Sequence, residues 1–158
     1  MFRYAFPVSE LVQAYKFQAR FGVGRYFAEQ LAAAAHGLQI DAVLPAPLHP
    51  HRLATRGFNQ SVLLAEPVAK ALGVPHLRDA VRKVRRVAPQ AGLTLDERRR
   101  NLRGAFAVQR RFDGMRLLVI DDVMTSGTTC DELAGALKEA GAARVEALVV
   151  ARTPAGPA

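Results

Sequence analysis

Residues Leu117 to Leu133 read LLVIDDVMTSGTTCDEL. Four apolar residues precede Asp121 and Asp122, and a short segment rich in hydroxyl side chains follows them. An uninterrupted apolar run of this length is typical of a strand that is buried on both faces, and we predict a strand over Leu117–Ile120. A helix is expected from Thr128 or Thr129 to Ala140, where Gly141 follows as a C-terminal cap. The stretch therefore predicts a buried strand, a turn and a helix.

Elements of the same kinds are expected on both sides of this stretch. Apolar strands alternate with helices, which is the pattern of a parallel sheet covered on both faces. We predict an α/β fold with a three-layer, mostly parallel sheet and helices on both faces. Further strands are expected over residues 42–44, 106–108 and 145–150, with weaker signals near 76–78 and 80–84. Helices are expected over about 9–17 with Ser9 as its cap, 23–35, 59–72 with a kink at Pro67, and 96–102 with Thr94 as its cap; residues 85–95 are expected to form a loop.

The composition limits the class of protein. A chain of 158 residues is expected to form a single domain, residues 1–158, with a helical N-terminal segment over residues 1–40. No run of apolar residues reaches the roughly 18 needed to span a membrane and no secretory signal is visible, so we expect a cytoplasmic protein. The single cysteine, Cys130, excludes an internal disulfide and a cysteine-rich zinc site within this chain. The net charge of +8 favours an anionic partner, because the excess arginines lie mostly in the middle third.

The turn after the aspartates has the composition of an anion site. Ligands of open parallel sheets bind beyond the carboxyl ends of the strands, which is where this segment lies. Gly127 supplies backbone freedom for the turn, and the free N–H groups of the next helix can bind an anion. The hydroxyls of Thr125, Ser126, Thr128 and Thr129 add donors. A monophosphate fits this segment, whereas the Gly-Lys-Ser/Thr element of a Walker A loop is absent.

The two aspartates have three alternative roles. Carboxylates accept hydrogen bonds from vicinal ribose hydroxyls, and they also bind Mg²⁺. Alternatively, they form only a turn and a helix cap. A response-regulator receiver is disfavoured, because its acidic pair lies near the start of the domain, whereas Asp121 and Asp122 lie near the end of this chain.

The segment LLVIDDVMTSGTT resembles the phosphoribosyl-pyrophosphate signature of type I phosphoribosyltransferases. Outside it, the chain is similar to the competence protein F family (ComF, GntX-like). The resemblance spans residues 9–153 and includes PAPLHP from Pro45, Arg52, Arg56, GFNQ from Gly57, Gln90, Leu93, Arg98, Asn101 and GAF from Gly104.

The resemblance implies a ligand, 5-phosphoribosyl 1-pyrophosphate with Mg²⁺, and a role for each matching residue. Asp121 and Asp122 would hold the ribose hydroxyls, and Mg²⁺ would be bound through the ligand or by these aspartates. The 5-phosphate would lie against Thr125, Ser126, Gly127, Thr128 and Thr129. The pyrophosphate would face Ala46, Pro47, Leu48, Arg52 and Arg56, and the lid residues Arg86 and Gln90 would close over it.

Three departures from the family pattern are visible. Relatives usually begin with a four-cysteine zinc module, which this chain lacks, so we expect either a short gene or a shortened form of a longer protein. Val87 stands where the lid is expected to have a threonine, and Pro67 interrupts a helix that is normally continuous.

Three functions remain open from the sequence. The first is an enzyme that transfers the phosphoribosyl group to a nitrogen nucleophile, for which His49 and His51 are weak candidates as general base and residues 1–40 are the candidate hood. The second is a non-catalytic competence factor that binds single-stranded DNA or partner proteins. The third is a regulator that senses the sugar phosphate. The sequence also leaves open whether the chain acts as a monomer or a homodimer.

Overall fold

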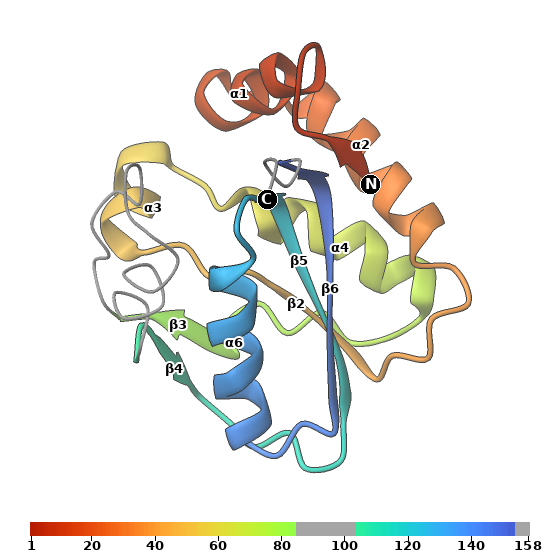
Figure 1. The fold of residues 1–158 in the computed structure, drawn as a ribbon, viewed down its shortest axis with the longest axis vertical. Helices are drawn as coiled ribbons and strands as arrows, with labels where there is room; N and C mark the ends of the chain where they lie inside the picture. The colour runs from red at the N-terminus through yellow and green to blue at the C-terminus, as the bar shows by residue number, and fades with distance from the viewer. Residues whose placement is uncertain (85–103, 154–158) are drawn as a thin grey trace, which may run out of the picture.

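The computed structural model of the chain describes residues 1–84 and 104–153. Its centre is a parallel sheet of four strands in the order β1-β6-β5-β2 (Figure 1). These strands are β1 (Phe2–Arg3), β2 (Ala42–Pro45), β5 (Arg116–Met124) and β6 (Arg144–Arg152). An antiparallel pair, β3 (Val81–Lys83) and β4 (Phe106–Val108), forms a second, smaller sheet. The predicted parallel sheet is confirmed.

Helices cover both faces of the parallel sheet, as predicted (Figure 1). Side chains alternate along β5, so Leu118 and Ile120 join the core with α2 (Phe21–Ala34) and α4 (Gln60–Leu72). Leu117 and Val119 point to the opposite face, where α6 (Thr128–Glu139) and the β3–β4 pair cover them. Burial on both faces explains why the sequence of β5 shows a continuous apolar run.

Helix α1 (Val8–Gln18) lies above the carboxyl ends of β5 and β6 (Figure 1). Its Val12 and Tyr15 are buried in the same core as α2 and α4. Strand β1, just before α1, pairs in parallel with the end of β6, at Phe2 with Ala151 and Arg3 with Arg152. The N-terminal segment is therefore packed against the end of the sheet at which parallel-sheet proteins bind ligands.

Several predicted boundaries differ from the structure. Strand β5 continues through both aspartates to Met124, because β6 pairs with it as far as Arg152. Ser9 does not cap α1: the helix begins at Val8, the N-cap is Pro7, and no side chain caps it. Pro50 begins an unpredicted short helix, α3 (Pro50–Arg56), since proline is well tolerated at the first helical position.

The long helix α4 has the predicted cap residues, Asn59 and Gly73. Pro67 lies inside it, yet the helix is continuous from Gln60 to Leu72. The carbonyl that loses its partner belongs to Leu63, whose side chain is 38% exposed, so water has access to this side of the helix. The predicted loop 85–95 and helix 96–102 lie outside the described residues. Among the described residues, no helix is long and apolar enough to cross a membrane.

Candidate functional site

Asp121 and Asp122 lie in β5 just beyond the point where its pairing with β2 ends, at Ile120 opposite Pro45. Asp121 is held by two donors: Ser61 Oγ lies 3.1 Å from its Oδ1, and the backbone N–H of Asp122 lies 2.8 Å from the same oxygen. Ser61 comes from the first turn of α4, which the Asn59 side chain caps by accepting a hydrogen bond from Ser61 N at 3.0 Å. The start of α4 therefore fixes the orientation of the first carboxylate.

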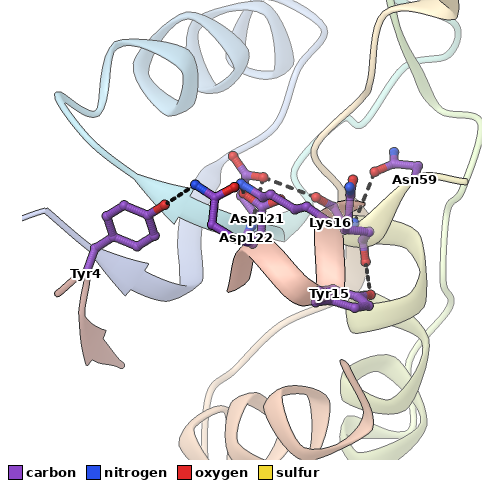
Figure 2. Close-up of polar contacts among 9 residues, drawn as sticks. Tyr4, Tyr15, Lys16, Asn59, Asp121 and Asp122 are labelled. Atoms are coloured by element: carbon purple, nitrogen blue, oxygen red, sulfur yellow. Dashed lines mark hydrogen bonds and ion pairs between the residues drawn. The ribbon is translucent and has the colours of Figure 1, made fainter. Parts of the chain in front are cut away.

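Asp122 forms an ion pair with Lys16 of α1, whose Nζ lies 2.7 Å from Asp122 Oδ1 (Figure 2). Both side chains are largely buried, with 18% of Lys16 and 13% of Asp122 exposed. The neighbouring Tyr15 hydroxyl donates to the backbone carbonyl of Gln60 at 3.0 Å, which fastens α1 to α4 (Figure 2). Each carboxylate thus has a side-chain partner from a different helix: Asp121 from α4 and Asp122 from α1.

Burial and the adjacent Asp122 carboxylate raise the pKa of Asp121 to about 7. The Asp122 N–H, Lys16 and Ser61 oppose this shift, because they favour the charged form. Burial and a second carboxylate this close both disfavour ionisation, so the pKa of Asp121 lies above its ordinary value.

The segment after β5 makes the predicted turn into a helix. Gly127 is the N-cap of α6 with φ 82°, a conformation that favours glycine. The buried Thr128 hydroxyl and the Ser126 hydroxyl share a hydrogen bond of 2.8 Å. The first N–H groups of α6 have no partner within the helix. Backbone and hydroxyl donors are therefore gathered at the helix start, which is suited to a phosphate.

The loop after β2 lies beside the aspartates. Ala46 N donates to the carbonyl of Ile120 at 2.8 Å, and Ala46 O accepts from Asn59 Nδ2 at 3.1 Å. Beyond Ala46 the loop leaves β5 and enters α3, where His49 is the N-cap and accepts from His51 N at 3.2 Å. His49 Nδ1 is thus used in capping α3.

Three cations, Arg52, Arg56 and Lys83, influence one another or the aspartates. The pKa of Arg56 is lowered, mainly by burial. The negative charge of Asp122 opposes this shift, and the positive charge of Arg52 adds to it. The pKa of Lys83 is also lowered, first by burial and then by the positive charge of Arg52. The negative charge of Asp121 opposes this shift. Lys83 Nζ lies 5.5 Å from the centre of the Phe106 ring. Arg56 therefore lies in the electrostatic field of Asp122 and Lys83 in that of Asp121, and Arg52 lies near both cations.

The C-terminal two thirds of the chain match the sequence model of the phosphoribosyl transferase domain, over residues 59–158. The chain belongs to the phosphoribosyl transferase domain family. The match includes β5, both aspartates, the turn at Gly127 and the start of α4 that holds Asp121.

Relatives of this phosphoribosyl transferase domain carry names connected with competence and DNA use. It is 33% identical over 159 residues to competence protein F of Haemophilus influenzae, with 94% of this chain and 69% of that protein covered. It is 36% identical over 157 residues to DNA utilization protein YhgH of Salmonella typhimurium, with 95% of this chain and 69% of that protein covered. The resemblance to the competence protein F family is confirmed.

Solved structures show the same fold. Glutamine phosphoribosylpyrophosphate amidotransferase from B. subtilis superposes with a TM-score of 0.58 at 22% identity, over 88% of this chain and 30% of that chain. Adenine phosphoribosyltransferase from Thermoanaerobacter pseudethanolicus gives a TM-score of 0.56 at 20% identity, over 85% of this chain and 71% of that chain. The predicted type I phosphoribosyltransferase fold is therefore confirmed.

The described structure brings most of the predicted site residues of this phosphoribosyl transferase domain to one end of the sheet. Asp121 and Asp122 lie between the turn at residues 125–129 and the loop at residues 46–48, and α3 carries Arg52 and Arg56. The lid residues Arg86 and Gln90 lie outside the described residues.

Sequence reasoning missed three residues of this site: Lys16, Ser61 and Lys83. A signal for two of them was present. Lys16 follows the buried Val12 and Tyr15 at helical spacing, and Ser61, which is 3% exposed, precedes the buried Leu64 and Ala65 at the same spacing. A polar side chain on the apolar side of a helix needs a polar partner, and here the partner is the aspartate pair.

The donor set fits Mg²⁺ only in part. No group of three His, Cys, Asp or Glu side chains that could hold a metal ion occurs within residues 1–84 and 104–153. Mg²⁺ is commonly bound by one or two carboxylates together with waters and substrate phosphates. Asp121 and Asp122 suit an ion held mainly by a phosphorylated ligand, and they do not form a metal cage by themselves.

Proposed function

We propose that this domain binds 5-phosphoribosyl 1-pyrophosphate together with Mg²⁺ and transfers the phosphoribosyl group to a nitrogen nucleophile. The observation that carries the proposal is the position of the aspartate pair, in which Asp122 is buried and Asp121 half-buried, beside the start of α6. Asp121 and Asp122 provide acceptors for two ribose hydroxyls, and the turn at residues 125–129 provides donors for the 5-phosphate.

The other end of the sugar would face the loop at residues 46–48. Arg52, Arg56 and Lys83 would stabilise the pyrophosphate, because all three carry positive charge near this loop. Mg²⁺, when bound with the ligand, would neutralise charge on the departing pyrophosphate. Arg86 and Gln90 are proposed as lid residues from the family resemblance alone.

In the reaction, the bond between C1 of the ribose and the pyrophosphate oxygen breaks, and a bond from C1 to nitrogen forms. The pyrophosphate leaves with the bonding electrons, and the proton lost by the nitrogen passes to the departing pyrophosphate or to water. The protein contributes positioning and charge stabilisation, since positive charge develops on the ring carbon as the pyrophosphate departs. Asp121 and Asp122 hold the ring and place negative charge near it.

We further propose that residues 1–40 act as the hood over this site within a single domain. Helix α1 lies above the carboxyl end of the sheet, and its Lys16 reaches Asp122 (Figures 1 and 2). We expect the reaction to take place in the cytoplasm.

A pyrophosphate-release assay tests the proposal. The phosphoribosyl donor is supplied with Mg²⁺ and a panel of nucleobases and ammonia. We expect release with the unchanged protein and loss of release in the double variant Asp121→Ala, Asp122→Ala. Asp79→Ala is the matched control, because Asp79 is exposed. Release that persists in the double variant contradicts the assignment of the site.

A second candidate, binding of single-stranded DNA without catalysis, is favoured by one observation. The Arg56 guanidinium lies 4.9 Å from the centre of the Phe17 ring, and this ring is 67% exposed. Phe21, also exposed, has its ring centre 5.3 Å from that of Phe58, and the two rings are tilted by 60°. Exposed aromatics beside arginines are suited to stacking and phosphate contacts. Filter binding should show affinity that falls steeply with salt and weakens in Phe17→Ala; binding that is insensitive to both contradicts it.

A further inference from the structure

Among the described residues, Lys16 is the cation that forms an ion pair with the aspartate pair. Its Nζ is 2.7 Å from Asp122 Oδ1, and 18% of its side chain is exposed. Burying an ammonium group carries a desolvation cost, so its position has to be explained. Lys16 belongs to α1, whereas the predicted ligand contacts all come from segments after residue 45.

The placement of Lys16 is fixed by its neighbour. The Tyr15 hydroxyl donates to Gln60 O at 3.0 Å, and the Tyr15 ring packs directly on Gly24 of α2. Tyr15 is 1% exposed. Because these contacts hold α1 against α2 and α4, the next residue is directed to the end of β5. The backbone of Lys16 is therefore held near Asp122 by contacts other than the ion pair.

The chemistry of the pair matches that of a sugar hydroxyl. Lysine has donors and no acceptor, an ionised aspartate has acceptors and no donor, and a hydroxyl has one donor and two acceptor lone pairs. A hydroxyl placed between them would donate to the carboxylate and accept from the ammonium. It would replace the direct ion pair by two charge-assisted hydrogen bonds.

We propose that Lys16 is a ligand-binding residue that contacts the same ribose hydroxyl as Asp122. This inference rests on the proposed function, and it assigns part of the sugar recognition to the N-terminal segment. The ligand class that it requires is a ribose 5-phosphate with its vicinal hydroxyls intact. A sugar that lacks the shared hydroxyl would leave the Lys16–Asp122 ion pair intact. Its affinity would not benefit from a hydrogen bond to Lys16.

The experiment measures binding by calorimetry in four ligands: phosphoribosyl pyrophosphate, ribose 5-phosphate, and the 2-deoxy and 3-deoxy forms of ribose 5-phosphate. The variants are Lys16→Met, which keeps the apolar stem, and Lys70→Met. Lys70 is an exposed lysine in the last turn of α4 and serves as the matched control. Circular dichroism and thermal unfolding check that both variants are folded.

We expect Lys16→Met to weaken ribose 5-phosphate binding by about 10- to 100-fold, the range for a hydrogen bond to a charged group. With the deoxy sugar that lacks the shared hydroxyl, the same substitution should change the affinity by less than about threefold. Lys70→Met should leave all affinities unchanged. An ion pair that only holds α1 in place predicts equal loss for every sugar, so equal loss overturns the inference while the proposed function survives. Failure of the unchanged protein to bind any of the four ligands overturns both.

Discussion

The Tyr15 ring packs against Gly24 so closely that a Cβ at residue 24 would lie 2.8 Å from Tyr15 Cζ. No side chain fits between α1 and α2 at this point, and the contact sets how near α1 approaches the sheet. The position of Lys16 above the aspartates depends on it.

Gly24→Ala should therefore destabilise the protein by about 1–3 kcal/mol, because the added methyl group forces Tyr15 out of its place. Gly22→Ala is the matched control, since Gly22 lies in the same helix with no atom within 4 Å of an added Cβ. It should be neutral or stabilise by up to about 1 kcal/mol. Urea unfolding of both variants measures the difference, and equal midpoints would show that α1 is not held in this way.

Ser61 holds Asp121 in place through its hydroxyl. Ser61→Ala removes that donor from a buried carboxylate, so we expect affinity for phosphoribosyl pyrophosphate to fall by about 5- to 20-fold. Ser9→Ala, in the first turn of α1, should have no such effect. Calorimetry at constant pH provides the measurement. Unchanged affinity in Ser61→Ala would mean that Asp121 needs no support from α4.

The raised pKa of Asp121 predicts a pH dependence of stability. The folded protein keeps a proton on this group up to a pH of about 7, whereas in the unfolded chain the group ionises near its ordinary value of 3.8. Between these values the folded state binds more protons, so the contribution of Asp121 to stability is greatest at low pH and falls as pH rises. The slope is at most about 1.4 kcal/mol per pH unit.

Asp121→Asn removes this titration. Compared with the unchanged protein, it should gain stability as pH rises from about 4 to about 7, apart from a constant offset for the altered Ser61 hydrogen bond. Urea unfolding at a series of pH values measures both proteins. A stability difference that does not change with pH would refute the raised pKa.

Cys130 lies in the first turn of α6, and burial together with Asp121 and Asp131 raises the pKa of its thiol to about 12. The thiol should consequently be neutral at pH 8 and react with iodoacetamide far more slowly than a free cysteine. Addition of denaturant should restore the ordinary rate. Rapid alkylation of the folded protein would show that this turn opens readily.

The sequence was sufficient to predict the parallel sheet, because β5 has a continuous apolar run that is buried on both faces and apolar strands alternate with helices along the chain. It also predicted the turn at Gly127 and the position of Asp121 and Asp122 just before it, because these residues are contiguous in the chain. Lys16 and Ser61 were missed because they lie far from the aspartates in sequence. Helical periodicity shows which side of a helix is buried, but it does not show which strand end that side meets.

Two local predictions failed for a related reason. The strand was expected to end with the apolar run at Ile120, yet pairing with β6 extends β5 to Met124. A cap was expected at Ser9, whereas α1 starts at Val8, because the side chains of Val12 and Tyr15 pack into the core and set where the helix lies. In both cases tertiary packing outweighed the local preference of the residue.

The most direct test of the central claim is calorimetric titration of phosphoribosyl pyrophosphate with Mg²⁺ into the unchanged protein and into the double variant Asp121→Asn, Asp122→Asn. These substitutions keep the size of the side chains and remove their charge. We expect a dissociation constant between micromolar and millimolar for the unchanged protein and loss of binding in the double variant. Absence of binding heat in the unchanged protein, or equal affinity in both proteins, would contradict the claim that the aspartate pair of β5 binds this sugar phosphate.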